Sequence, residues 1–149
     1  MRAVVQRVRQ AAVHVEGEAV AEMGEGLLAL VGVGRDDTES DADELARKLV
    51  GLRIFNDESG RMSRSLLDTG GRLGLVSQFT LLGDARKGRR PSFTAAAPAE
   101  RAEPLVERVA ATARSEGVTV VTGRFGAKME VSLVNQGPVT ILVDTDRGF

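Results

Sequence analysis

The chain contains no cysteine and only one histidine, and these shortages exclude several kinds of chemistry. Without cysteine it has no disulfide, no thiolate nucleophile and no cysteine-ligated zinc site. Because His14 is the only imidazole, we expect neither a Ser-His-Asp triad nor a histidine-rich metal site, and we assign His14 no role. The sequence therefore predicts no metal and no cofactor, and any catalysis has to use other groups.

Long apolar runs are also missing. No stretch approaches the roughly 18 apolar residues of a membrane-spanning helix. Residues 1–7 (MRAVVQR) lack the long apolar core of a signal peptide. Together with the lack of cysteine, this predicts a soluble protein of the reducing cytoplasm with no membrane partner.

Positive and negative charges nearly balance, since the chain has 20 Lys and Arg and 21 Asp and Glu, a net charge of −1. This balance argues against a protein held on nucleic acid by bulk electrostatics alone. The only concentrated positive charge is residues 86–90 (RKGRR), within a polar loop. This loop is either a local contact for RNA phosphates or a solvated loop that binds nothing.

The rest of the composition is that of an ordinary globular protein. The 149 residues are 42% hydrophobic and 28% charged, which predicts one folded domain spanning residues 1–149. Strand-like alternation, helical periodicity and turn residues indicate three strands, a helix, a strand, a second helix and three more strands. This order predicts an α/β or α+β fold with a mixed sheet and two main helices. The expected strands are residues 3–15, 19–23, 27–33, 73–79, 118–121, 129–134 and 139–143, and the expected helices are residues 41–54 and 101–117.

Three local details accompany these elements. The apolar run 27–33 suits a central strand buried on both faces. Residues 40–43 (SDAD) resemble a capping box at the start of the first helix. Pro104 is expected in the first turn of the second helix, because a proline in a helix interior costs about 3 kcal/mol.

Two segments carry residue patterns of chemical interest. In the first, Ser77-Gln78-Phe79-Thr80-Leu81, an apolar strand ends in polar side chains around one aromatic ring. In the second, Asn135-Gln136-Gly137-Pro138-Val139-Thr140, a Gly-Pro pair interrupts a strand pattern. Taken alone, the first is typical of a strand edge meeting solvent and the second of a hairpin turn.

Taken together with the opening residues 1–8 (MRAVVQRV), the two segments resemble the D-aminoacyl-tRNA deacylase (D-tyrosyl-tRNA deacylase) family. The similarity covers essentially the whole chain in length and motif order. It implies a barrel-like mixed sheet and a cytoplasmic homodimer that binds the 3′ end of aminoacyl-tRNA, with no DNA partner. It also implies hydrolysis of the ester that joins a D-amino acid, or glycine, to tRNA, while L-aminoacyl-tRNA is left intact.

The resemblance implies a site that suits a chain poor in acid–base residues. Ester hydrolysis needs donors for the developing oxyanion, and backbone N–H groups can supply them. The resemblance places the scissile carbonyl near the backbone of Phe79 and Thr80, with Ser77 and Gln78 completing the pocket floor. A nucleophilic Thr80 hydroxyl would need a base within reach, and the sequence offers no obvious one. We therefore favour backbone amides together with the ribose 2′-hydroxyl of the substrate.

Rejection of L-amino acids needs a built-in clash. By resemblance, Gly137-Pro138 is a cis element that one subunit inserts into the site of its partner, where main-chain atoms fill the space of an L side chain. Arg7 is the candidate for holding that segment, and the alternative is a charge on a strand surface. Phe125 and Met129 either line the adenosine or amino-acid pocket or pack in the core.

Two other functions fit the sequence less well than deacylation. A non-catalytic RNA- or ribosome-associated module would use the basic loop, but it has no need for residues 78–80 facing a Gly-Pro pair. A hydrolase of small acyl esters is disfavoured by the scarcity of acid–base side chains.

Overall fold

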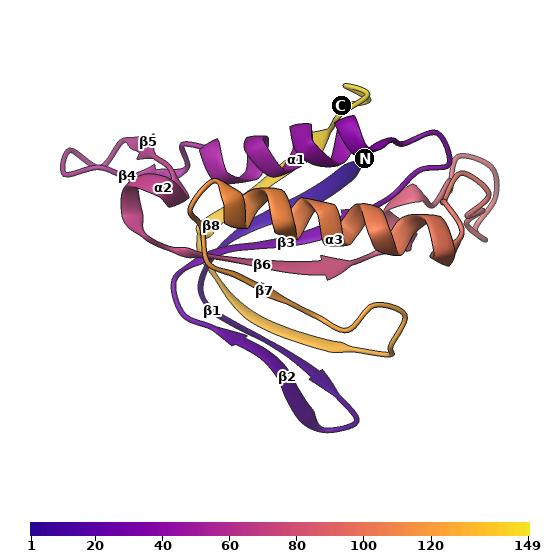
Figure 1. The fold of residues 1–149 in the computed structure, drawn as a ribbon, viewed down its shortest axis with the longest axis horizontal. Coiled ribbons are helices and arrows are strands. Elements are labelled where there is room, and N and C mark those ends of the chain that lie inside the picture. The colour runs from indigo at the N-terminus through magenta and orange to yellow at the C-terminus, as the bar shows by residue number, and fades with distance from the viewer.

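The computed structural model describes all residues, 1–149. The chain folds into a mixed β-sheet with two long helices packed against one of its faces (Figure 1). A short second sheet and a one-turn helix follow the first long helix, and a 3-10 turn follows the strand β6. The strands are β1 (Arg2–Val15), β2 (Glu18–Met23), β3 (Gly26–Gly32), β4 (Phe55–Asn56), β5 (Met62–Arg64), β6 (Arg72–Ser77), β7 (Val120–Thr122) and β8 (Glu130–Asp144). The helices are α1 (Glu39–Gly51), α2 (Leu66–Thr69), η1 (Phe79–Leu82) and α3 (Ala99–Ser115).

The strand pairing confirms the predicted mixed sheet. The strand β1 pairs antiparallel with β3 and β2 along one edge and with β8 along the other, while β3, β6 and β7 run parallel. The lower half of β1 and the strand β2 bend away from the helices, and β2 also contacts β6 and β7 (Figure 1). The sheet therefore curls toward a barrel.

Two apolar clusters fill the spaces on the two sides of this curved sheet. The larger cluster lies between the sheet and the helices and includes Val5 and Leu27, and the smaller one lies inside the curl and includes Val8 and Leu28. Neighbouring residues of β3 thus enter opposite clusters, as expected for a central strand buried on both faces. This confirms the prediction for residues 27–33.

Both long helices begin earlier than the sequence predicted. The helix α1 starts at Glu39 because Thr38 is its N-cap and shares a capping box with Asp41, so the box assigned to residues 40–43 is wrong. It ends at Gly51, since Leu52 adopts extended backbone angles (φ −57°, ψ 121°), and the expected extension to residue 54 is wrong. Ile54 is buried, which explains why it fitted the periodicity.

In α3 the expected place of Pro104 is also wrong. The helix begins at Ala99, so Pro104 lies in its second turn and leaves one main-chain hydrogen bond unmade. A stripe of apolar residues that includes Leu105 and Val109 packs into the larger cluster and compensates for that bond. The helix ends at Ser115, short of the expected residue 117, where Gly117 takes a φ of +99°.

The two strands expected at 129–134 and 139–143 are one strand, β8, so the interpretation of the Gly-Pro pair as a turn is wrong. The chain does not reverse there. The pairing with β1 instead shifts register on either side of Val8. The side chain of Asn135 spans the interruption: its Oδ1 accepts from the Val139 N–H at 2.8 Å, and its Nδ2 donates to Gln6 Oε1 at 2.9 Å.

The α-amino group of Met1 is buried and joins three parts of the chain. It donates to Asp37 Oδ1 at 2.7 Å and to Thr145 Oγ1 at 2.6 Å. Asp37, also buried, accepts in turn from the Gly34 N–H at 2.5 Å. The first residue therefore fixes the loop before α1 and the segment after β8. Among the helices, none has the length and apolarity needed to cross a membrane.

Candidate active site

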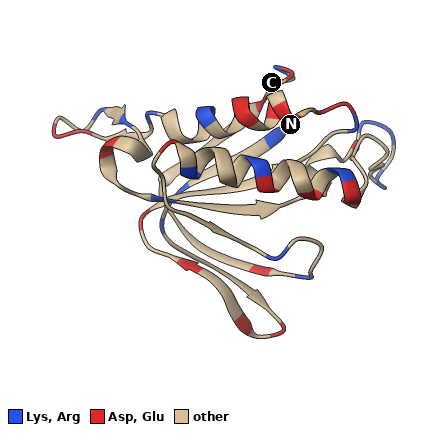
Figure 2. Cartoon of the chain, in the orientation of Figure 1, with Lys and Arg blue, Asp and Glu red and all other residues tan.

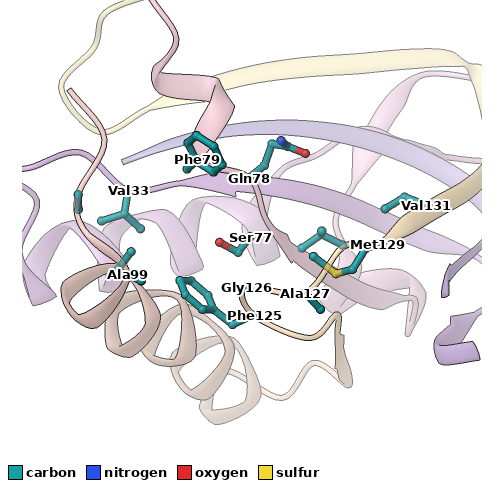
Figure 3. Close-up of a pocket in the computed structure, with 13 residues that line it drawn as sticks. Val33, Ser77, Gln78, Phe79, Ala99, Phe125, Gly126, Ala127, Met129 and Val131 are labelled. Atoms are coloured by element: carbon teal, nitrogen blue, oxygen red, sulfur yellow. The ribbon is translucent and has the colours of Figure 1, made fainter. Parts of the chain in front are cut away.

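A cavity of about 360 Å³ opens where β6 ends, between the sheet, the start of α3 and the loop from β7 to β8 (Figure 3). Its walls are mainly apolar, and none of the lining side chains is titratable. The lining residues are Val33, Val76, Ser77, Gln78, Phe79, Ala97, Ala99, Ala102, Phe125, Gly126, Ala127, Met129 and Val131. A reaction here cannot draw a proton-transfer group from the cavity wall, so main-chain groups and the bound molecule must supply the chemistry.

The first motif forms one edge of this cavity. The strand β6 ends at Ser77, two residues before the expected end at residue 79, because the chain then turns into η1. The Gln78 N–H donates to the Val31 carbonyl at 2.7 Å and holds the turn against β3. Phe79 and Thr80 are the first two residues of η1, so their N–H groups have no carbonyl partner within that turn. Two adjacent main-chain donors are therefore free beside an apolar cavity.

The Thr80 side chain lies outside the cavity lining. Its hydroxyl accepts a hydrogen bond from the Gln78 side-chain amide, which is not a base. Ser77, in contrast, projects into the cavity opposite the Phe125 ring (Figure 3). No arrangement in the structure activates the Thr80 hydroxyl as a nucleophile.

Phe125 and Met129 each face the cavity on one side and pack against the core on the other. Both line the cavity, and both are half-buried. Phe125 packs against the larger apolar cluster and Met129 against the smaller one. They are therefore cavity wall and core at the same time.

The second motif lies elsewhere in the chain. Gly137 borders a separate cavity of about 620 Å³, together with Arg7, Asn56, Gly70 and Gly71. The Gly137–Pro138 peptide bond is cis. Because Gly71 precedes β6 and Ser77 ends it, the strand carries the two cavities about 20 Å apart. One chain thus does not bring its own Gly-Pro pair to its Ser77 cavity.

Arg7 is a buried cation, 8% exposed, that contacts the second motif directly. Its Nε donates to the Gln136 carbonyl at 2.9 Å, and one terminal nitrogen donates to the Ile54 carbonyl at 2.9 Å. The same nitrogen donates to Asn56 Oδ1 at 3.3 Å. Arg7 therefore holds residue 136 against the segment after α1, and its interpretation as a surface charge is wrong.

Sequence reasoning missed the wall formed by Val33 and by the alanines at positions 97, 99 and 102. Small apolar residues such as these are indistinguishable in a sequence from ordinary core and surface positions, so no signal in the sequence marks them. Their small size leaves the space that becomes the cavity.

One group of acidic residues could in principle hold a cation. The carboxylates of Asp37, Asp41 and Asp146 lie within 4.8 Å of one another. Asp37 is occupied by the Met1 ammonium, and the Thr38 N–H holds the pKa of Asp41 below its usual range. None of these residues lines the cavity at the end of β6. The group is accounted for by the buried amino terminus.

Comparison with known proteins gives a consistent result. A family model described as D-Tyr-tRNA(Tyr) deacylase matches residues 4–144. D-aminoacyl-tRNA deacylase of Kosmotoga olearia is 58% identical over 149 residues, all of both chains. The protein of the same name from a Roseiflexus species is 60% identical over 145 residues, covering 97% of this chain and 94% of the relative.

Two solved structures share the fold. One, titled c-Myc DNA Unwinding Element Binding Protein, superposes with a TM-score of 0.92 at 39% identity, covering 97% of this chain and 99% of the other. The other is described as a probable eukaryotic D-amino acid tRNA deacylase. It gives a TM-score of 0.83 at 18% identity, covering 95% and 97% of the two chains. At that identity the second match shows the fold alone.

Proposed function

The chain belongs to the D-Tyr-tRNA(Tyr) deacylase family, and on that premise we infer that it hydrolyses the ester bond of D-aminoacyl-tRNA, releasing free D-amino acid and tRNA. The observation that carries this function is the full-length match to deacylases. The structure adds a cavity whose free main-chain donors suit ester hydrolysis without a side-chain base. The direct test is release of amino acid from matched D- and L-aminoacyl-tRNA.

We propose that the free N–H groups of Phe79 and Thr80 bind the ester carbonyl oxygen. As water adds to the carbonyl carbon, negative charge builds on that oxygen, and preorganised donors stabilise it. The carbon–oxygen bond to the ribose then breaks, and the ribose oxygen takes a proton. The neighbouring ribose hydroxyl is the available proton relay, because no titratable side chain lines the cavity.

Ser77 and Gln78 form the floor under the carbonyl, and the Phe125–Met129 wall faces the adenosine or the amino acid. The apolar character of this wall supports the assignment, since an aromatic ring and a thioether offer contact area without competing polar groups.

Glycine has no side chain to clash, so glycyl-tRNA is expected to be hydrolysed as well. The cytoplasmic location remains a prediction.

We propose further that the working enzyme is a homodimer with shared sites. Gly137 and Pro138 are exposed, and one chain holds them at the opposite end of β6 from the cavity. A second copy related by a two-fold axis would bring each Gly-Pro pair to the other copy's cavity. Its main-chain atoms would then occupy the space of an L side chain.

This proposal predicts a dimer in solution. Light scattering coupled to size-exclusion chromatography is expected to give twice the chain mass of 15.8 kDa. A cross-link between cysteines introduced at positions 79 and 138 should join two chains and not form within one. A monomer that retains full activity and selectivity would contradict the shared site.

The Thr80→Ala variant is expected to keep most of its activity, because the proposed donor is the main-chain amide and not the hydroxyl. Removal of a true oxyanion donor costs about 2.7–4 kcal/mol, or about a hundredfold or more in rate. Single-turnover hydrolysis of D-aminoacyl-tRNA measures this difference, and Thr80→Val, which keeps the side-chain shape, is the matched control. A hundredfold loss in both variants with the fold intact would assign chemistry to the hydroxyl.

A further inference from the structure

The basic segment of the chain forms a hairpin-like loop between η1 and α3. Asp84 and Ser92 close its base with two main-chain hydrogen bonds of 2.7 and 2.9 Å. Within it lie Arg86, Lys87, Arg89 and Arg90, and residues 85–97 contain no acidic side chain. The loop projects from the body next to the start of α3, and its Lys and Arg residues are clustered there (Figure 2).

Three of these four cations are free. Arg86 makes an ion pair with Asp84 at 2.6 Å, and this contact holds the pKa of the Asp84 carboxyl far below its usual range. Lys87, Arg89 and Arg90 are exposed and make no ion pair. The loop therefore presents three uncompensated positive charges to solvent.

Two aromatic rings connect this loop to the cavity. Phe93, just after the loop, packs edge-to-face on Phe79 with ring centroids 5.3 Å apart. Gly83 permits this approach, because a Cβ there would come within 2.9 Å of the Phe93 ring. Phe79 lines the cavity, yet it is 56% exposed and Phe93 is 37% exposed. An open aromatic surface thus lies between the cavity and the cations.

An ester bound in the cavity brings the rest of its nucleic acid with it. If the acyl carbonyl lies at the amides of Phe79 and Thr80, the exposed Phe79 ring gives the chain of phosphates a path out of the cavity. Phosphate contacts by Lys and Arg set the position of a nucleic acid, and aromatic faces stack on single-stranded bases. The order of cavity, aromatic pair and cations matches the order of ester, terminal bases and phosphates.

We propose that Lys87, Arg89 and Arg90 bind the phosphates of the single-stranded 3′ end of the substrate, and that the Phe79–Phe93 pair supports one of its bases. This assignment rests on the proposed function, because it takes the acyl ester as the group in the cavity. It also explains how a chain with a net charge of −1 binds RNA, since the contact is local.

The test uses the variant K87Q/R89Q/R90Q and the matched control R9Q/K48Q/R61Q, which removes three exposed cations outside the loop. Both are assayed with D-tyrosyl-tRNA and with the D-tyrosyl ester of adenosine, which keeps the ester and lacks phosphates. For the loop variant we expect KM for the tRNA to rise about five- to tenfold with kcat unchanged. The slope of log KM against log salt should fall by about 2, at roughly 0.7 for each phosphate contact.

Hydrolysis of the adenosine ester should be the same in the loop variant, the control and the unmodified protein. An unchanged KM for the tRNA, or an equal effect on both esters, would overturn the proposal. If the unmodified protein hydrolyses neither ester, it is the proposed function that fails. Equilibrium binding of uncharged tRNA then tests the loop separately. The proposal requires the loop variant to bind tRNA more weakly than the control variant does.

Discussion

Replacing Asp37 by alanine is expected to lower the free energy of unfolding by about 3–5 kcal/mol, because it leaves the buried Met1 ammonium without its carboxylate. The same change removes the acceptor of the Gly34 N–H. Urea denaturation at neutral pH measures the loss. The neighbouring Asp36→Ala, at an exposed position, is the matched control and should stay within about 0.5 kcal/mol of the unmodified protein.

The amino terminus can be tested without changing any residue. A chain that starts with Gly-Ser before Met1, or one whose terminal amine is acetylated, cannot keep a charged amine at the position that donates to Asp37 and Thr145. Both chains should lose about as much free energy of unfolding as the Asp37→Ala variant. The same dipeptide added after Phe149 should change the free energy of unfolding little, because that residue is exposed. Equal denaturation midpoints for all of these chains would show that the buried ion pair is not structural.

The Gly137→Ala variant is expected to lower the ratio of D- to L-aminoacyl-tRNA hydrolysis by about 30-fold, or about 2 kcal/mol of discrimination. Gly137 has a φ of +133°, and an added Cβ would lie 2.8 Å from Val139 Cγ2 and 3.0 Å from an Arg7 terminal nitrogen. The segment must therefore shift. If its main-chain atoms fill the space of an L side chain, the shift removes the clash that rejects L-amino acids.

The control for this variant is Gly17→Ala. Gly17 also has a positive φ of +81°, but an added Cβ there meets nothing within 4 Å, and the residue lies in the turn between β1 and β2. Gly17→Ala should carry the same kind of backbone strain as Gly137→Ala, because both glycines have a positive φ, and it should leave the D-to-L ratio unchanged. A ratio in Gly137→Ala equal to that of the control would place chiral selection outside this segment.

The sequence predicted the parts of the fold that one dominant local signal determines. The apolar run of β3 is long enough to identify a strand buried on both faces, and the structure confirms it. Where two signals competed, prediction failed. Thr38 displaced the expected cap of α1, and the Asn135 side chain carried β8 through a Gly-Pro pair that is ordinarily turn chemistry.

For the candidate site, the sequence predicted the residues that differ from their surroundings. Polar side chains at the end of an apolar strand marked Ser77 and Gln78, and both line the cavity. Ala99 and Ala102 line it too, but their roles depend on how α3 lies over the sheet, which no local pattern encodes. The burial of the Met1 amine is likewise a tertiary contact between residues 36 positions apart.

The most direct test of the central claim is the release of amino acid from D-tyrosyl-tRNA and L-tyrosyl-tRNA, prepared on the same tRNA and incubated with equal enzyme. We expect hydrolysis of the D-ester to exceed that of the L-ester by about a hundredfold or more. Equal rates would contradict selection by a main-chain clash. No release above the uncatalysed rate from either ester would contradict catalysis itself and favour a non-catalytic RNA-binding role.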